Sequence, residues 1–135
     1  MAEEHPNVQA VRQGFEAMDR GDTNWMMDHM ADDIVWHIGG KSKVAGEYRG
    51  KDAVTAMLAQ QMPVYQTAKV DVHDVVGNDQ HVIAIGRASV DDPDGGTVSW
   101  LYANVFHIEN GITKEVWGLA DETSESDQLL NKLIP

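Results

Sequence analysis

The stretch Ala31–Gly40, Ala-Asp-Asp-Ile-Val-Trp-His-Ile-Gly-Gly, followed by Tyr48–Val54, Tyr-Arg-Gly-Lys-Asp-Ala-Val, decides how this chain folds. The first segment is typical of a short strand that ends in an aromatic residue and a histidine. A glycine-rich loop and a helix start follow it. Binding and catalytic groups concentrate where a rigid element gives way to a loop. The pattern therefore makes His37 a candidate functional residue.

Length and composition indicate one globular domain over residues 1–135, because 135 residues is an ordinary domain size and 42% of them are hydrophobic. The absence of cysteine excludes disulfides, thiolate nucleophiles and cysteine-type zinc sites. The polar first residues show no secretory signal, and no apolar run approaches the roughly 18 residues of a membrane helix. These features are consistent with a cytoplasmic protein that does not interact with membranes.

The charge balance is strongly acidic, with 22 Asp and Glu residues, 10 Lys and Arg residues and a formal net charge of -12. Nucleic acids and anionic lipids are bound mainly by Lys and Arg, which neutralise their phosphates. The sequence therefore predicts no nucleic-acid partner, and the acidic surface is read as a solvated one.

The first half of the chain shows helical periodicity around the strand at 32–38. Apolar residues at helical spacing predict a helix over 6–20, with Pro6 at its start and Gly21 at its end. Asp22 is expected to cap a second short helix. A third helix is predicted over 50–62, with Pro63 near its end.

The second half alternates with a period of two, which predicts strands over 69–76, 81–90, 98–108 and 113–120. Glycine-containing turns separate them, with Asn110-Gly111 as a hairpin turn. Ser124 is expected to cap a short terminal helix. Helices followed by a four-strand antiparallel meander indicate an α+β domain.

These segments together resemble the SnoaL-like polyketide cyclase family of the nuclear transport factor 2-like superfamily, with ketosteroid isomerase and limonene epoxide hydrolase as more distant relatives. The resemblance rests on 31–37, 48–54, 72–79, 104–111 and 115–121, and so covers nearly the whole chain. It implies a cone-shaped curved antiparallel sheet wrapped around N-terminal helices, a pocket at one end, and homodimers packed through the outer sheet face.

The same resemblance suggests roles for three residues. His37 stands where the isomerase has its general-base aspartate, and Asn104 where it has its oxyanion-binding acid. Asp121 matches the acid/base aspartate of the polyketide cyclases. Tyr102 is two residues before Asn104 and so on the same strand face, which makes it a second hydrogen-bond donor. The competing interpretation gives each of them a structural or solvated role.

Other residues are candidates for contacts with a ligand. Aromatic and flexible side chains in this half-buried sheet and its helices could line a pocket for a flat apolar molecule. His107 is opposite in parity to Asn104, so only a bulge would bring both into one pocket. The expected substrate-binding set is Trp36, Tyr48, Met57, Trp100, Tyr102, His107 and Trp117.

The histidines are scattered without metal-ligand spacing, and no phosphate-binding glycine loop is present, so no metal and no cofactor are expected. The Arg and Asp pattern of the epoxide hydrolases is also missing. The leading hypothesis is a cofactor-free acid/base enzyme, of cyclase or isomerase type, acting on a small apolar carbonyl compound. The alternatives are a non-catalytic binding module of the same fold and a dimerisation domain with a filled interior.

Overall fold

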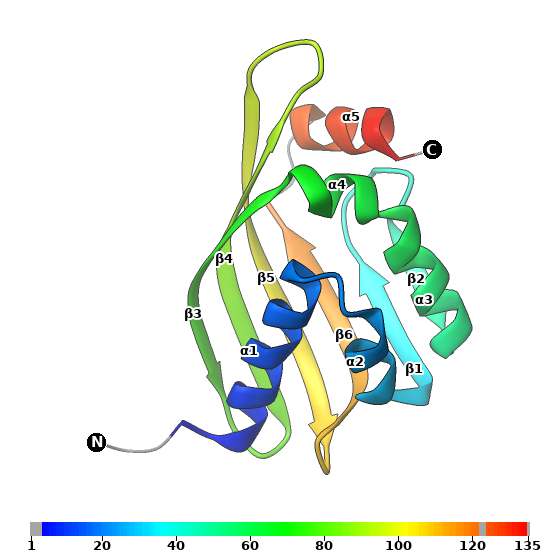
Figure 1. The fold of residues 1–135 in the computed structure, drawn as a ribbon, viewed down its shortest axis with the longest axis vertical. Coiled ribbons are helices and arrows are strands. Elements are labelled where there is room, and N and C mark those ends of the chain that lie inside the picture. Colours follow the sequence, from blue (N-terminus) through cyan, green and yellow to red (C-terminus); the bar gives the residue numbers. More distant parts are fainter. Residues whose placement is uncertain (1–3, 122–123, 135) are drawn as a thin grey trace.

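The computed structural model describes residues 4–121 and 124–134, and Figure 1 shows their arrangement in two layers. Helices α1 and α2 cross one face of a strongly twisted sheet, and α3 lies beside β1. Helix α4 leads from α3 toward β4, and α5 lies at one end of the sheet. This α+β architecture with N-terminal helices confirms the fold class that the sequence predicts.

Helix α1 (Pro6–Asp19) and helix α2 (Thr23–Asp28) form close to where the capping signals place them. Proline stands in the first turn of α1, where a missing N–H costs nothing. Gly21 adopts a left-handed φ of 71° between the two helices. The Asp22 carboxylate then accepts a hydrogen bond from the Trp25 N–H at 3.0 Å, so the predicted cap of α2 is confirmed.

Strand β1 (Met30–Ile38) contains most of the segment Ala31–Gly40, and it pairs with an additional strand β2 (Gly46–Arg49). The sequence pattern predicted a loop in place of β2, because four residues with two glycines nearby carry no alternation that could be recognised. Gly50 starts α3 (Lys51–Gln60) at a φ of 91°. The predicted third helix breaks at Gln61, where α4 (Met62–Thr67) begins with proline in its first turn.

The predicted meander is confirmed as β3 (Lys69–Gly77), β4 (His81–Asp91), β5 (Thr97–Glu109) and β6 (Ile112–Ala120). Its last turn has φ of 53° at Asn110 and 79° at Gly111, the positive values that an Asn-Gly hairpin requires. The sheet order is β2-β1-β6-β5-β4-β3. Strands β1 and β6 run parallel, which the long intervening chain permits.

The parity of β5 determines which residues face the helices. Tyr102 and Ile108 are 9% and 1% exposed, and Asn104 and Phe106 lie between them on the same face. Three apolar clusters pack between this face and the helices, and Phe106 contacts two of them.

Helix α5 (Ser124–Leu133) packs through Leu129, which is 1% exposed, against the third cluster. It begins at the residue expected to cap it, but the Ser124 side chain lies outside the described part of the chain. No helix among the described residues is long and apolar enough to cross a membrane.

Candidate functional site

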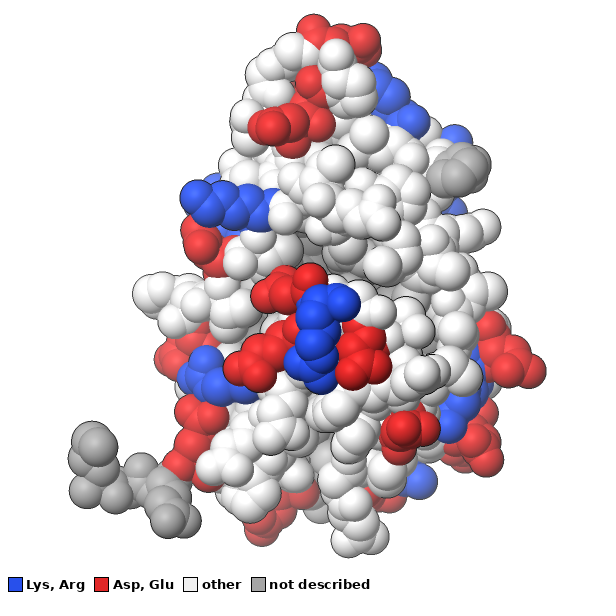
Figure 2. All heavy atoms as spheres, viewed as in Figure 1, with Lys and Arg blue, Asp and Glu red and all other residues white. Residues whose placement is uncertain are grey.

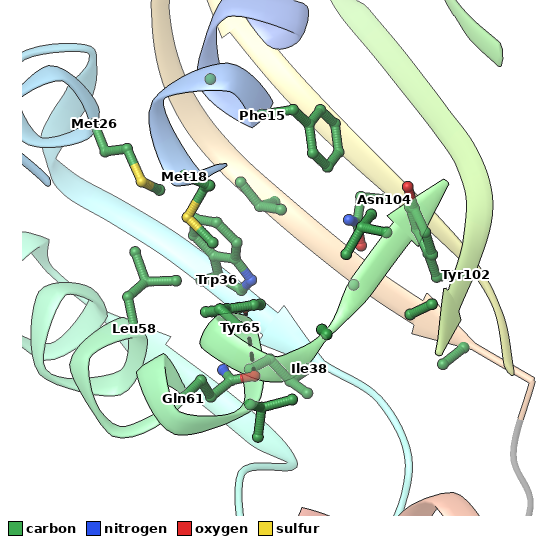
Figure 3. Close-up of a pocket in the computed structure, with 18 of the residues that line it drawn as sticks. Phe15, Met18, Met26, Trp36, Ile38, Leu58, Gln61, Tyr65, Tyr102 and Asn104 are labelled. Atoms are coloured by element: carbon green, nitrogen blue, oxygen red, sulfur yellow. Dashed lines mark hydrogen bonds between the residues drawn. The ribbon is translucent and has the colours of Figure 1, made fainter. Parts of the chain in front are cut away.

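A cavity of about 840 Å³ lies between the helices and the concave face of the sheet. Figure 3 shows its two walls: Trp36, Gln61, Tyr65 and Leu58 on one side, and Asn104 and Tyr102 of β5 on the other. Its lining is mainly apolar and aromatic, as in small-molecule sites. The aromatic lining residues are Phe15, Trp25, Trp36, Tyr65, Trp100, Tyr102 and Phe106.

The β5 wall presents two polar groups to this cavity, Tyr102 and Asn104, two residues apart on one strand face. Opposite Asn104 in the sheet lies Gly118, where an added Cβ would be 3.5 Å from the Asn104 Oδ1. Opposite Tyr102 lies Gly86 on the other side, where an added Cβ would be 2.6 Å from the Tyr102 Oη. The two glycines thus leave the space that the two polar side chains occupy.

The Tyr102 hydroxyl is buried and, within the described residues, has no hydrogen-bond partner. The side-chain amide of Asn104 also makes no hydrogen bond to another described residue. Burial, and then the nearby negative charge of Asp71, raise the pKa of Tyr102. Its hydroxyl therefore stays protonated and can donate a hydrogen bond. A buried polar group without a partner costs free energy, which a ligand oxygen at this position would recover.

The opposite wall carries a second polar group that the sequence analysis missed. The Tyr65 hydroxyl donates a hydrogen bond to the Gln61 Oε1 at 3.5 Å, and the Gln61 Nε2 lies 2.9 Å from the Met57 Sδ. Burial raises the pKa of Tyr65 to about 12. The spacing of Leu58, Gln61 and Tyr65 was the available signal, because residues three and four apart share a helix face.

Asp121 lines the cavity at its rim with an exposed side chain. Strand parity alone would have placed it with Trp117 on the outer face. The strand ends at Ala120, however, so parity no longer sets its direction. Its backbone N–H donates to the Leu101 carbonyl at 2.8 Å, which places Asp121 beside the Tyr102 end of β5.

His37 is not among the residues that line the cavity. Its Nε2 lies 2.5 Å from the Glu115 Oε2, its Nδ1 lies 4.0 Å from the Glu47 Oε1, and its ring stacks on Trp117 at 5.7 Å between centroids. The preceding residue, Trp36, does line the cavity. Because strand side chains alternate, the structure separates His37 from Asn104 and Asp121 by the thickness of the sheet.

Of the residues expected to contact a ligand, some line the cavity and others do not. Trp100, Trp36 and Tyr102 line the cavity. Tyr48 and Met57 are absent from the lining and belong to the neighbouring apolar cluster; the Tyr48 hydroxyl donates to the Val44 carbonyl at 2.8 Å.

Trp117 and His107 also lie outside the cavity lining, on the face of the sheet that carries His37. Trp117 stacks on His37. His107 packs against His81 at 4.9 Å and lies 3.2 Å from the Glu109 carboxylate. The irregularity in the β5–β6 pairing comes after His107, between it and Ile108, so no bulge brings His107 and Asn104 to the same face.

Groups of three or more His, Asp or Glu side chains that could hold a metal ion do not occur within residues 4–121 and 124–134. The lining of the described cavity offers the hydroxyls of Tyr65 and Tyr102, the side-chain amides of Gln61, Gln66 and Asn104, the His29 imidazole, an aromatic wall and carboxylates.

Comparisons with known proteins agree on one family. Residues 11–116 match the family model of the SnoaL-like domain. Uncharacterized proteins of Mycobacterium bovis and Mycobacterium tuberculosis are 35% identical over 83 residues, which are 60% of this chain. The matched segment spans 63% of the length of these curated relatives.

Solved structures share the fold at low identity. A nuclear transport factor 2-like protein of unknown function from Burkholderia pseudomallei superposes with a TM-score of 0.78 at 21% identity, covering 92% of this chain and 96% of that one. IdmH, a candidate polyketide cyclase from Streptomyces antibioticus, superposes with a TM-score of 0.73 at 18% identity, covering 95% and 99%. These likenesses establish the nuclear transport factor 2-like fold.

Proposed function

Since this chain belongs to the SnoaL-like domain family, we propose that it binds a small, largely apolar compound bearing a carbonyl oxygen and transfers a proton within it, as cyclases and isomerases do. The observation that carries the proposal is the buried Tyr102 hydroxyl, which has no partner among the described residues and lies next to Asn104 in an aromatic cavity. The fold alone would not support a function, because one fold hosts many unrelated activities.

Tyr102 and Asn104 are suited to hold the carbonyl oxygen. Both carry hydrogen-bond donors, and both project from one strand into a cavity with a mainly apolar lining. Donors fixed in such an environment stabilise negative charge that develops on an oxygen more strongly than donors in water do. The aromatic wall formed by Trp36, Trp100 and Phe106 would hold the apolar body of the compound.

Asp121 is the proposed base. Its carboxylate would take a proton from the carbon next to the carbonyl, the electrons of that C–H bond would form a C=C bond, and the carbonyl electron pair would move to the oxygen held by Tyr102 and Asn104. Returning the proton to another carbon would give an isomer. Attack of the enolate carbon on a second carbonyl carbon of the same molecule would give a ring, with the π electron pair of that carbonyl moving to its oxygen, which then takes the proton from Asp121. His37 has no part in this scheme, because it lies outside the cavity lining.

The test is proton exchange in a simple ketone. In D2O, 2-tetralone loses the hydrogens next to its carbonyl, and proton NMR follows the loss. We expect wild-type protein to accelerate this exchange, Asp121→Asn to reduce the acceleration about 100-fold or more, and Tyr102→Phe to reduce it about 10- to 100-fold.

Two further variants make the test specific. Asp33→Asn removes an exposed carboxylate that does not line the cavity, and it should leave exchange unchanged. His37→Gln should also leave exchange unchanged. A large loss of exchange rate in this variant would show that His37 takes part in the reaction. Equal exchange in wild type and Asp121→Asn would refute the proposed base.

A binding module without chemistry is the second candidate, and the exposure of the Asp121 side chain favours it, because water has free access to the proposed base. Tight binding of the ketone with no accelerated exchange would support this candidate. A filled interior, the third possibility, is incompatible with a cavity of about 840 Å³.

Association of two copies through the outer sheet face is part of the same proposal. Large apolar side chains that do not line the cavity are exposed on β3, β4 and β5: Leu101 at 48%, Val76 at 47% and Ile85 at 42%. Exposed apolar patches of this kind commonly mark interfaces. Sedimentation equilibrium should give twice the monomer mass for wild type, and Leu101→Asp should shift it toward the monomer.

A further inference from the structure

The rim of the cavity is rich in carboxylates. Asp19, Asp121 and Asp127 line it, whereas Arg20 is the one Lys or Arg among the described lining residues. The Arg20 guanidinium is already bound to the Asp22 carboxylate at 3.2 Å. In Figure 2, a basic side chain flanked by acidic ones lies over the α1–α2 connection, next to a hollow in the surface. The side chains at the entrance therefore carry a net negative charge.

A further negative charge acts on the cavity from outside its lining. Asp71 has an exposed side chain, and after burial it is the second cause that raises the pKa of the Tyr102 hydroxyl, the group that would hold the ligand oxygen. Cavity walls of low dielectric constant focus such fields instead of damping them. The whole chain adds to this, with a formal net charge of -12.

Asp19 stands at a position that helix energetics disfavours. It is the last residue of α1, whose last turn contains no basic side chain. The C-terminal end of a helix carries partial negative charge, so an acidic residue there is destabilising. A local rule broken without a compensating contact is more common at functional positions than elsewhere.

We propose that Asp19 and Asp127 select ligands by charge, so that the cavity accepts uncharged compounds and rejects anionic ones of the same shape. The inference rests on the proposed function, since it concerns the same cavity, and it narrows the substrate class to neutral carbonyl compounds. Carboxylated or phosphorylated compounds are excluded because their charge would face the carboxylates of the rim on entry.

The test uses three probes of nearly equal shape: 2-naphthylmethanol, which is neutral, 2-naphthoate, which is anionic, and 2-naphthylmethylammonium, which is cationic. Titration calorimetry at low salt should show naphthoate binding to wild type about tenfold or more weakly than the alcohol, with the ammonium at least as tight as the alcohol. The difference should shrink to roughly threefold in about 0.5 M salt, because salt screens exposed charges.

A pair of double variants separates the rim from the net charge. Asp19→Asn/Asp127→Asn should reduce the preference for the alcohol over naphthoate to roughly threefold at low salt. Asp33→Asn/Asp52→Asn removes the same number of charges from exposed positions that do not line the cavity, and the preference should persist. Asp121 is left intact in both, so the proposed base is not altered.

Each outcome decides between the two proposals. Equal binding of naphthoate and the alcohol to wild type would refute charge selection and leave the proposed function standing. Equal loss of the preference in both double variants would assign it to net charge and refute the role of Asp19 and Asp127. Failure of all three probes to bind would refute the apolar cavity site itself, and charge selection with it.

Discussion

The two faces of the six-stranded sheet have different chemistry, although the same strands form both. The concave face carries Trp36, Tyr102, Asn104 and Phe106 around a cavity. On the outer face, His37 pairs with Glu115, and apolar side chains remain exposed. Polar groups outside satisfy one another, whereas two polar groups inside have no partner within the described chain. The difference indicates that the inside is prepared for a ligand.

The largest expected effect comes from neighbouring residues on opposite faces of β5. Phe106→Ala should lower the free energy of unfolding by about 3 kcal/mol, because Phe106 packs against two apolar clusters and against Phe15 at 6.5 Å. Val105→Ala, one residue away and facing outward, should cost less than about 1 kcal/mol. Urea denaturation measures both, and equal losses would contradict the difference between the faces.

The concave face should also be intolerant of added volume where Tyr102 packs. Gly86→Ala places a Cβ that overlaps the Asp71 backbone oxygen and lies 2.6 Å from the Tyr102 Oη, so we expect a loss of about 2 kcal/mol. The matched variant is Gly118→Ala, whose nearest contact is the His37 carbonyl at 3.4 Å. It should cost less than about 1 kcal/mol. Thermal unfolding of the two variants gives the comparison.

The smallest expected effect is a gain in stability. Tyr102→Phe removes a buried hydroxyl that has no partner among the described residues, so it should raise the free energy of unfolding by about 1 kcal/mol. The same change should weaken binding of 2-tetralone, because the ligand oxygen loses a donor. Loss of stability together with unchanged binding would show that the hydroxyl has a structural partner instead.

Local patterns predicted most of the fold. The cap at Asp22, the turn at Asn110-Gly111 and the alternation in β3 to β6 each follow from interactions between near neighbours in the sequence. The second strand, Gly46–Arg49, was missed because it is short and its structure depends on pairing with β1. The parallel pairing of β1 with β6 likewise joins segments far apart in the chain.

The candidate site was predicted less completely. Asn104, Tyr102 and Asp121 line the cavity as expected, but His37 does not. The pattern at the end of β1 indicated the correct segment, because Trp36, next to His37, lines the cavity. Which of two adjacent residues faces inward depends on register against β6, where a shift of one residue exchanges the faces. Gln61 and Tyr65 were missed because their helix face could have packed against any apolar surface.

The sequence by itself determined the class of fold, the positions of most helices and strands, and the acidic character of the chain, because propensity, caps, turns and charge are properties of short segments. The tertiary structure decided which side of each strand faces the helices, that a cavity remains there, and that the Tyr102 hydroxyl lies in it with no partner in the described part of the chain. These depend on packing between distant segments, and burial of a polar group can be judged only when all of its neighbours are in place.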